Sequence, residues 1–259
     1  MATKYYVVWQ GRETGIFTDW LTCKRQIDKF PGARYKSFKT LPEAESAFRG
    51  TPGGATRASA TGSKPAARKR AGAKTVKTYS SSEIAALALD TMIFTDGGCD
   101  PNPGEAGSGV VVYRDGQVDE LWYGLYNPRG TNNSAELNAL HEALKIAEQE
   151  VSESRTTAIF CDSKYAIQCL THWAVNWQKK GWKKSGGEIK NLELIKAMFA
   201  LYQRVKTRIN IYHVNGHVGV EGNELADRMS IVAMESREPS FTRYQEAIDI
   251  PRLLALRAG

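Results

Sequence analysis

Short apolar runs that end at a carboxylate occur twice in the second half of the chain. Residues 92–94 form one such run, and Asp96 follows it. A run this short favours a buried strand over a helix. Because a strand covered on both faces leaves no favourable place for a charge, we expect Asp96 at the rim of a sheet. Residues 157–161 and Asp162 repeat the pattern, and a helix is expected from Ser163 on.

The other elements of this half alternate between strand and helix. Residues 109–114 and 121–126 predict two strands joined by a hairpin, and residues 209–214 predict another strand. Apolar residues at helical spacing between positions 137 and 147 predict a helix, and a second helix is expected at 223–227. The pattern therefore predicts a mixed α/β sheet flanked by helices.

Residues 1–50 predict a separate, small α+β module. Strand patterns near 5–9 and 36–38 accompany helical spacing at 22–30 and 43–48. About fifty residues is small for independent folding but sufficient.

Aromatic and basic residues alternate in this module, and two interpretations of them stay open. Trp20 and Tyr35 form part of the core of a small domain, or they stack on bases and sugars while Arg34 and Lys36 contact phosphates.

Two segments lack a clear apolar pattern. Residues 51–82 are rich in small, polar and basic residues, which predicts a flexible linker. Its basic cluster at 68–70 is either part of a solvated tether or an additional site of attraction for phosphates. The linker separates the module from a domain at 83–240. Residues 241–259 form a tail, which packs back as a short helix or stays loose.

Charge is distributed unevenly along the chain. Residues 1–50 carry nine Lys/Arg against five Asp/Glu, residues 51–82 seven against none, and residues 83–259 nineteen against twenty-three. This asymmetry favours a polyanionic partner bound by the N-terminal third, with an acidic remainder that needs cations to approach the same partner.

The four cysteines form no Cys-x-x-Cys pair, and no apolar run near the start is long enough for a leader peptide or a membrane span. We therefore expect a reduced, cytoplasmic protein that does not bind membranes.

The candidate chemistry rests on the carboxylates Asp96, Glu136, Asp162 and Asp227, which are predicted at strand ends and helix starts. For Glu136 the alternative is helix stabilisation in the first turn, with Asn133 as the cap. Gathered at one rim, the four would repel one another unless hard cations such as Mg²⁺ or Mn²⁺ were bound. Two ions about 3.5–4 Å apart suit in-line cleavage of a phosphodiester.

Five ordered motifs between residues 92 and 234 resemble those of ribonuclease HI. They are Thr95-Asp96-Gly97-Gly98-Cys99, Asn102-Pro103-Gly104, Thr131-Asn132-Asn133 with Ala135-Glu136-Leu137, Cys161-Asp162-Ser163, and Gly216-His217 with Gly222-Asn223-Glu224-Leu225-Ala226-Asp227. The resemblance implies a mixed five-stranded sheet flanked by helices and makes the four carboxylates metal ligands.

The same resemblance implies further roles in the catalytic domain. His217 would assist proton transfer or product release, although a lone histidine is more often structural. Cys99, Asn102 and Asn132 would lie along the RNA strand, where the 2′-hydroxyl separates RNA from DNA. Thr131 and Asn191 would accept a DNA phosphate, and Ser134 stands where several relatives have an arginine.

Residues 172–184 interleave lysines with three tryptophans and resemble the basic protrusion of the longer ribonucleases HI. Trp177 would pack on the sugars of the DNA strand, and Lys179 and Lys180 would contact phosphates. The alternatives are that Trp173 and Trp177, at helical spacing, belong to the core and that the lysines are merely solvated.

Residues 4–49 resemble the N-terminal hybrid-binding domain of many type 1 ribonucleases H and of caulimovirus viroplasmin. The resemblance rests on Gly11-Arg12-Glu13-Thr14-Gly15-Ile16-Phe17, Trp20, Cys23 and Phe30-Pro31-Gly32-Ala33-Arg34-Tyr35-Lys36-Ser37-Phe38. It implies that Trp20 and Tyr35 pack on the DNA strand and that Lys36 contacts a phosphate, while Ser37 replaces a frequent second basic residue.

Taken together, the patterns and the two resemblances imply a monomeric endoribonuclease that binds RNA/DNA hybrids, without a protein partner, and uses two Mg²⁺ ions, or Mn²⁺, to cut the RNA strand. By the same resemblance, the expected products carry 5′-phosphate and 3′-hydroxyl ends. A non-catalytic hybrid-binding protein with the same fold is the main alternative. A transposase or integrase is a further one, but it would lack the His217 loop and the N-terminal module.

Overall fold

The computed structural model describes residues 4–28, 30, 32–38, 40–49, 76–184, 186–216 and 219–259. The chain divides into two compact units, residues 1–70 and 71–259, and each is considered by itself. Within the described residues, no helix is both long and apolar enough to cross a bilayer.

The described part of the N-terminal unit is a three-stranded antiparallel sheet with two helices. Its strands, in the order β2-β1-β3, are β1 (Tyr5–Gln10), β2 (Gly15–Phe17) and β3 (Arg34–Phe38), and its helices are α1 (Trp20–Ile27) and α2 (Leu41–Arg49). Its fully buried residues are Val7, Val8, Cys23 and Ala44. The predicted α+β module is therefore present, with a core that excludes Trp20 and Tyr35.

The C-terminal unit is built on a mixed sheet. Three antiparallel strands, β5 (Thr91–Asp100), β6 (Gly104–Arg114) and β7 (Gln117–Gly130), are followed by β8 (Thr157–Cys161) and β9 (Ile209–Val214), which run parallel to β5. The five-stranded mixed sheet expected from the sequence is confirmed. A two-residue strand adds to each of its edges, β10 (Thr242–Arg243) beside β7 and β4 (Thr78–Tyr79) beside β9, which gives the order β10-β7-β6-β5-β8-β9-β4.

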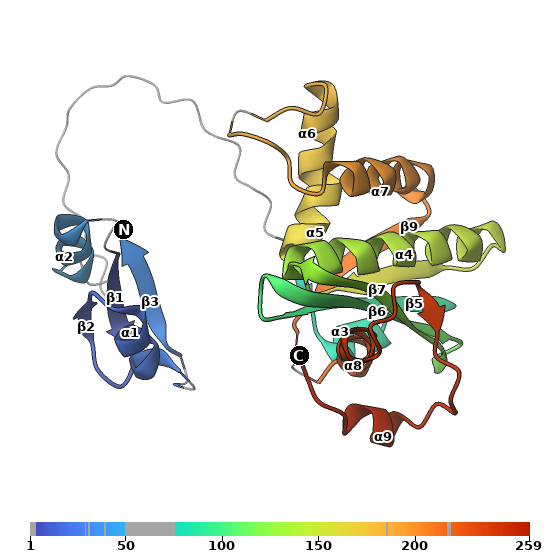
Figure 1. Cartoon of the computed structure of the whole chain (residues 1–259), viewed down its shortest axis with the longest axis horizontal. Helices are drawn as coiled ribbons and strands as arrows, with labels where there is room; N and C mark the ends of the chain where they lie inside the picture. Colours follow the sequence, from blue (N-terminus) through green and yellow to red (C-terminus); the bar gives the residue numbers. More distant parts are fainter. Residues whose placement is uncertain are drawn as a thin grey trace. The chain divides into compact units, whose positions relative to one another are not determined.

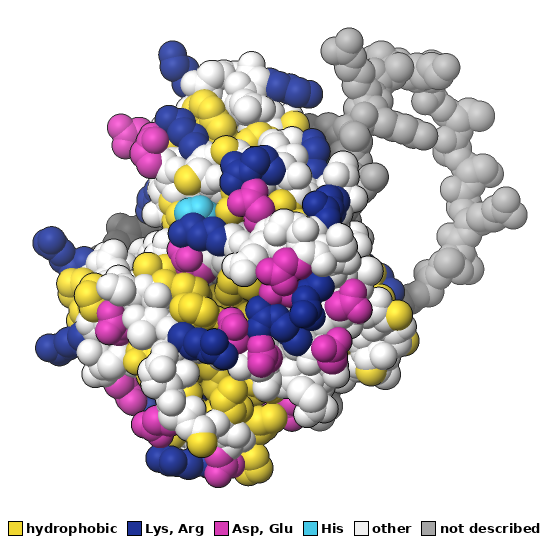
Figure 2. Space-filling model, turned by 90° about the vertical axis from the view of Figure 1, so that its right-hand side faces the viewer, with side chains coloured by type: hydrophobic (Ala, Val, Ile, Leu, Met, Phe, Trp, Pro, Cys, Tyr) yellow, Lys and Arg dark blue, Asp and Glu magenta, His cyan; other side chains and the backbone are white. Residues whose placement is uncertain are grey.

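Helices cover both faces of this sheet (Figure 1). The helices α4 (Asn132–Ser152) and α7 (Leu192–Val205) lie on one side, and α8 (Glu221–Ser236) lies on the other. Between β8 and α7 the chain forms α5 (Lys164–Gln168), the π-helical turn η1 (Cys169–Trp173) and α6 (Ala174–Lys179). Basic side chains gather at the end of the unit that carries α6, shown at the top of Figure 2.

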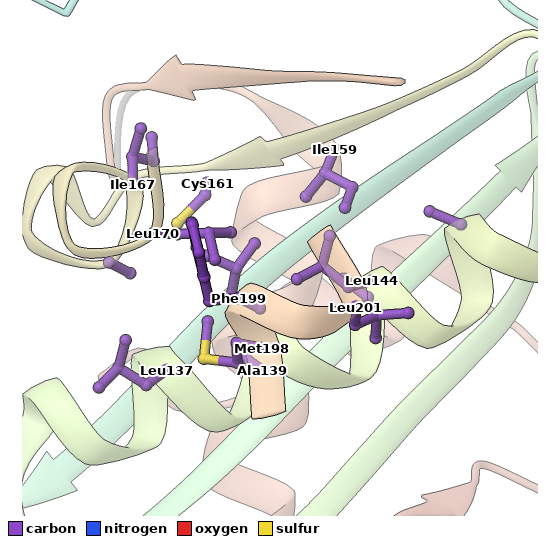
Figure 3. Close-up of a cluster of buried hydrophobic side chains, with 14 of the residues drawn as sticks. Leu137, Ala139, Leu144, Ile159, Cys161, Ile167, Leu170, Met198, Phe199 and Leu201 are labelled. Carbon is purple, nitrogen blue, oxygen red and sulfur yellow. The ribbon is translucent and has the colours of Figure 1, made fainter. Parts of the chain in front are cut away.

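The core between the sheet and helices α4 and α7 is formed by large aliphatic side chains (Figure 3). Leu137 and Leu144 of α4 face Met198 and Phe199 of α7, with Ile159 of β8 beside them. All five are at most 2% exposed, so the apolar face predicted between residues 137 and 147 lies in this core.

The C-terminal unit includes residues that lie before the expected linker end at residue 82. Strand β4 (Thr78–Tyr79) pairs in parallel with β9, and the rings of Tyr79 and Tyr212 lie 4.4 Å apart. Ser80 then forms a capping box with Glu83 at the start of α3 (Ser81–Ala85). The polar composition of residues 76–82 gave no sign of a strand, because β4 forms only by pairing with β9.

The tail at 241–259 packs back on the same unit, as one of its two expected alternatives. Phe241 stacks on Trp122 with ring centroids 5.3 Å apart, and β10 (Thr242–Arg243) pairs with β7. A short helix, α9 (Ile250–Leu254), then buries Leu253 against the α8 side of the sheet.

Helix α8 lies directly on the backbone of β6, and Gly109 is one of the glycines of this strand that permit the close contact. A Cβ added at Gly109 would lie 2.1 Å from the carbonyl oxygen of Ala226. Because the backbone atoms of β6 and α8 cannot move apart without disturbing the packing, Gly109→Ala should lower the free energy of unfolding by about 1–3 kcal/mol. Denaturant titration of the full chain measures this. The matched control is Gly186→Ala, where no atom lies within 4 Å of the added Cβ; equal stability of the two variants would contradict the close packing.

Candidate active site

Helices α4 and α8 both pack closely against the backbone of β5, just after the apolar run at residues 92–94. Successive residues of a strand face opposite sides of the sheet. A Cβ at Gly97 would lie 2.3 Å from the backbone nitrogen of Glu136 in α4, and one at Gly98 would lie 2.8 Å from Ser230 Oγ in α8. The two glycines after Asp96 therefore let α4 and α8 approach the strand from its two faces.

Asp96 and Asp162 occupy equivalent places on neighbouring strands. The parallel ladder between β5 and β8 ends with the pair Thr95 and Cys161, and the two aspartates are the next residues. Strand β5 itself continues to Asp100 along β6, so Asp96 does not end its strand as expected. The rim lies instead on the β8 side, where the neighbouring strand stops.

The structure brings the four predicted carboxylates into one cavity of about 370 Å³. Asp96, Glu136 and Asp227 are only 6%, 6% and 3% exposed, and Asp162 is partly buried. They come from β5, α4, the end of β8 and α8, which are far apart in the sequence.

Glu136 is not in the first turn of its helix. Helix α4 begins at Asn132, and its N-cap is Thr131, whose hydroxyl accepts the Ser134 N–H while Ser134 Oγ accepts the Thr131 N–H. The expected cap at Asn133 and the helix-stabilising role of Glu136 are therefore wrong. Among the described residues, no hydrogen-bond partner meets the buried Oε2 of Glu136.

Burial and mutual repulsion make this cavity unfavourable for negative charge. Burial, together with the carboxylates of Asp162 and Asp227, raises the pKa of Asp96 well above its usual range. Burial, together with Asp96 and Asp162, does the same to the pKa of Glu136. A bound divalent cation would compensate both effects.

The donor set fits a hard cation. Besides the carboxylates, the Cys161 thiol lies close enough for its sulfur and oxygens of Glu136 and Asp162 to fall within 4.8 Å of one another. However, burial raises the pKa of Cys161 well above its usual range, and the side chain points into the apolar cluster near Leu170 (Figure 3). Carboxylate oxygens are therefore the available ligands, which suits Mg²⁺ or Mn²⁺.

Asp227 is contacted by residues that the sequence patterns did not single out. Arg228 donates to its carboxylate, and the Gly259 N–H lies 3.2 Å from each of its oxygens. Arg257, which also lines the cavity, pairs with Asp100 at 2.7 Å. That Arg228 follows Asp227 is visible in the sequence, but the approach of Gly259 to the Asp227 carboxylate depends on how α9 packs.

Asp162 is held by two side chains from other elements. Asn223 Nδ2 lies 3.4 Å from Asp162 Oδ2, and His213 Nε2 lies 3.0 Å from the Asp162 carbonyl oxygen. Gly216 leaves room for the carboxylate, because a Cβ there would lie 2.5 Å from Oδ2. Alternation along 209–214 predicted a strand at His213 but no contact with Asp162.

Most residues expected along the RNA strand lie around the cavity. Cys99 and Asn132 line it, and Asn102 Oδ1 accepts the Asn132 N–H at 3.3 Å. Thr131, expected at a DNA phosphate, is the N-cap of α4 beside them. His217 lies outside the described residues, so its role remains a prediction.

The residues expected on the DNA strand at the basic protrusion do not line the carboxylate cavity. Trp177 is partly buried, with its ring 6.0 Å from that of Trp173, and both pack against the core. Lys179 and Lys180 are exposed. Asn191 precedes α7 in a left-handed conformation with φ of 56° and makes no side-chain capping bond.

In the N-terminal unit, the predicted aromatic residues are at the surface. Trp20 is 39% exposed and Tyr35 is 48% exposed, with ring centroids 6.0 Å apart. Arg34 and Lys36 are exposed on β3 beside Tyr35. Of the two interpretations of these rings, a buried core is therefore wrong.

Comparison with known proteins places both units in one family. The model of the RNase H family matches residues 89–235, and that of the Ribonuclease H1 N-terminal domain matches residues 4–48. Ribonuclease H1 of Mus musculus is 33% identical over 260 residues, which cover 87% of each chain. Ribonuclease H of Thermosynechococcus vestitus is 39% identical over 137 residues, 52% of this chain and 82% of its own. The chain therefore belongs to the ribonuclease H family, a class of metal-dependent endonucleases.

Solved structures support the fold. LC9-RNase H1, described as a type 1 RNase H with the type 2 active-site motif, superposes with a TM-score of 0.50 at 22% identity, covering 66% of this chain and 82% of that one.

The raised pKa of Glu136 leads to a stability prediction. A group whose pKa is higher in the folded state favours folding at low pH, and this contribution is lost as the pH rises through the folded pKa. Without metal at neutral pH, Glu136→Gln should therefore have a higher Tm than the parent, with a difference that shrinks as the pH falls towards the ordinary value of 4.5. Added Mn²⁺ should raise the Tm of the parent more than that of the variant, because the variant lacks a ligand.

Thermal unfolding with and without Mn²⁺ provides the measurement. Glu193→Gln is the control, since this glutamate is 83% exposed on α7 and its one ion pair within the described part of the chain is with Lys196. If both variants behaved alike, the assignment of Glu136 to a cation site would be wrong.

Proposed function

We propose that this chain hydrolyses the RNA strand of RNA/DNA hybrids at the cavity formed by Asp96, Glu136, Asp162 and Asp227. Membership of the ribonuclease H family supports activity on such hybrids. The observation that carries the location is the convergence of four carboxylates in one cavity, with a buried Glu136 oxygen that no described group satisfies.

The four carboxylates would hold two Mg²⁺ ions, with Mn²⁺ as an alternative. When bound, such ions activate water as the nucleophile and stabilise the leaving oxygen of an in-line displacement. The chain itself contributes positioning: the glycines of β5 fix α4 and α8, and Asn223 holds the Asp162 carboxylate. His217, by resemblance, would move a proton or assist product release, and the products would carry 5′-phosphate and 3′-hydroxyl ends.

Recognition of the RNA strand would take place at the rim of the cavity. Two of the residues concerned, Cys99 and Asn132, line the cavity there. The third, Asn102, accepts a hydrogen bond from the Asn132 N–H. Amide and backbone groups at this rim suit the 2′-hydroxyl, which is both a donor and an acceptor and is absent from DNA.

The DNA strand would contact Thr131 beside the cavity and a second surface made of Trp177, Lys179, Lys180 and Asn191. Exposed lysines attract phosphates without regard to sequence, and a partly exposed indole ring stacks on sugars or bases. The separation of this surface from the cavity supports a duplex that presents one strand to each.

The N-terminal module would hold the hybrid for the catalytic unit. Trp20 and Tyr35 offer two neighbouring exposed rings, and Arg34 and Lys36 add positive charge beside them. A second binding module on one chain raises the effective concentration of the substrate near the first. The chain would act as a monomer, since each proposed contact comes from this chain.

The central test is cleavage of an end-labelled RNA/DNA hybrid with Mg²⁺. Asp162→Asn should lower the rate by more than about 100-fold, because even groups outside the ligand shell of a metal site are worth about 10- to 100-fold. Asp115→Asn is the matched control: Asp115 occupies the hairpin turn with φ of 50°, which Asn tolerates, and it does not line the cavity. Cutting by Asp162→Asn at the parent rate, or no cutting by the parent, would refute the proposal.

The N-terminal module can be tested separately by binding. Trp20→Ala should weaken hybrid binding about tenfold, since stacking of one base contributes about 1–3 kcal/mol. Fluorescence anisotropy with a labelled hybrid, in the absence of divalent metal, measures the Kd. Leu41→Ala is the control, because Leu41 is also exposed in this unit, at 41%, but carries no ring. Equal affinity of the two variants would exclude stacking on Trp20.

A further inference from the structure

His213 is a buried histidine that connects two separate segments of the catalytic unit. Only 3% of its surface is exposed, and it does not line the carboxylate cavity. Its Nδ1 lies 2.8 Å from Thr78 Oγ1 in β4, and its Nε2 lies 3.0 Å from the carbonyl oxygen of Asp162. A buried ring with both nitrogens in hydrogen bonds has one orientation only.

The chemistry of the two partners fixes the hydrogen positions on this ring. A carbonyl oxygen only accepts hydrogen bonds, so Nε2 must carry the proton and donate to Asp162. In the neutral ring Nδ1 is then an acceptor, which suits the Thr78 hydroxyl as the donor. The pKa of His213 is lowered, mainly by burial, which agrees with a neutral ring.

The hydrogen bond from His213 Nε2 to the Asp162 carbonyl oxygen lies just beyond the end of the β8–β9 ladder. The parallel ladder between β8 and β9 ends with the pair Cys161 and His213, and Asp162 follows immediately. Beyond that pair, the His213 side chain continues the connection by binding the Asp162 backbone. The carboxylate of the same residue, held by Asn223, lines the cavity.

The sheet brings Thr78 to the other side of His213. In the parallel ladder between β4 and β9, Thr78 is the register partner of His213. Since side chains of register partners project from the same face, the Thr78 hydroxyl reaches the ring across the ladder. Strand β4 is thereby connected to Asp162 through one histidine.

We propose that His213 is a positioning residue of the catalytic site, oriented by Thr78, and that it holds Asp162 in the place from which its carboxylate binds a divalent cation. This inference rests on the proposed function, because it assumes that Asp162 is a metal ligand. Strand β4 would then act on the site indirectly, because its Thr78 orients the histidine that holds Asp162.

The alternative is that His213 is simply a core residue whose replacement affects folding alone. Two pairs of matched variants separate these possibilities. His213→Gln keeps a side chain that donates to the Asp162 carbonyl and accepts from Thr78, whereas His213→Leu keeps an apolar volume and loses both bonds. Thr78→Ser keeps the hydroxyl, and Thr78→Val removes it from a side chain of nearly the same shape.

The experiment measures Mn²⁺ affinity of the full chain by calorimetry, without nucleic acid, together with thermal unfolding. Groups of this kind contribute about 10- to 100-fold to metal affinity. We expect His213→Leu to lose affinity in this range and Thr78→Val to lose less. His213→Gln and Thr78→Ser should stay within about threefold of the parent, since they retain the bonds.

Nitrogen-15 NMR of the parent provides an independent test, and it should find a neutral His213 ring with the proton on Nε2. A proton on Nδ1 alone would overturn the proposal. So would unchanged affinity in folded His213→Leu, or equal losses in His213→Gln and His213→Leu. If His213→Leu does not fold, Thr78→Val decides, and parent-like affinity there overturns the role of Thr78 in orienting the ring.

The outcomes also separate this inference from the proposed function. If the parent binds Mn²⁺ through Asp162 but cuts no hybrid, the proposed function fails while the role of His213 stands. If the parent cuts hybrids and His213→Leu binds Mn²⁺ as tightly as the parent, the function stands and the positioning role fails.

Discussion

The repulsion among four carboxylates in a single, largely buried cavity is the constraint on which this structure depends. Such a cluster persists only because the packing around it leaves the side chains nowhere else to go. Gly97, Gly98 and Gly109 let α4 and α8 lie directly on β5 and β6, so close backbone packing positions the helices that carry Glu136 and Asp227. A bound divalent cation would compensate this unfavourable charge.

The exposed surfaces that suit nucleic acid differ in their chemistry. Polar amide groups lie at the rim, close to the carboxylates, whereas the exposed lysines of the α6 region lie on a surface that does not include the cavity. The N-terminal unit adds exposed rings with neighbouring positive charge. The positive charge of these lysines, which would pair with the carboxylates, is thus kept away from the cavity. Arg228 and Arg257, by contrast, both contact acidic groups at the cavity.

The segments that flank the family-matched residues 89–235 are part of the same unit. Strand β4 reaches Asp162 through His213, and the tail after α9 reaches Asp227 through Gly259. Two of the four carboxylates are therefore contacted by elements that belong to the ends of the domain. The limits of the motifs in the sequence are narrower than the limits of the structure that supports them.

The sequence by itself determined the mixed sheet, the small α+β module and the four carboxylates, because apolar periodicity and short motifs are local properties. It also marked Trp20 and Tyr35, but their exposure was decided by how α1 and β3 meet. The start of α4, which puts Glu136 beyond the first turn, follows from the local capping box of Thr131 and Ser134. Only tertiary structure made Thr78 and Tyr79 a strand and brought His213 to Asp162. Each of these depends on a partner far away in the chain, and the residues within any one segment contain no information about which distant backbone group will be its neighbour.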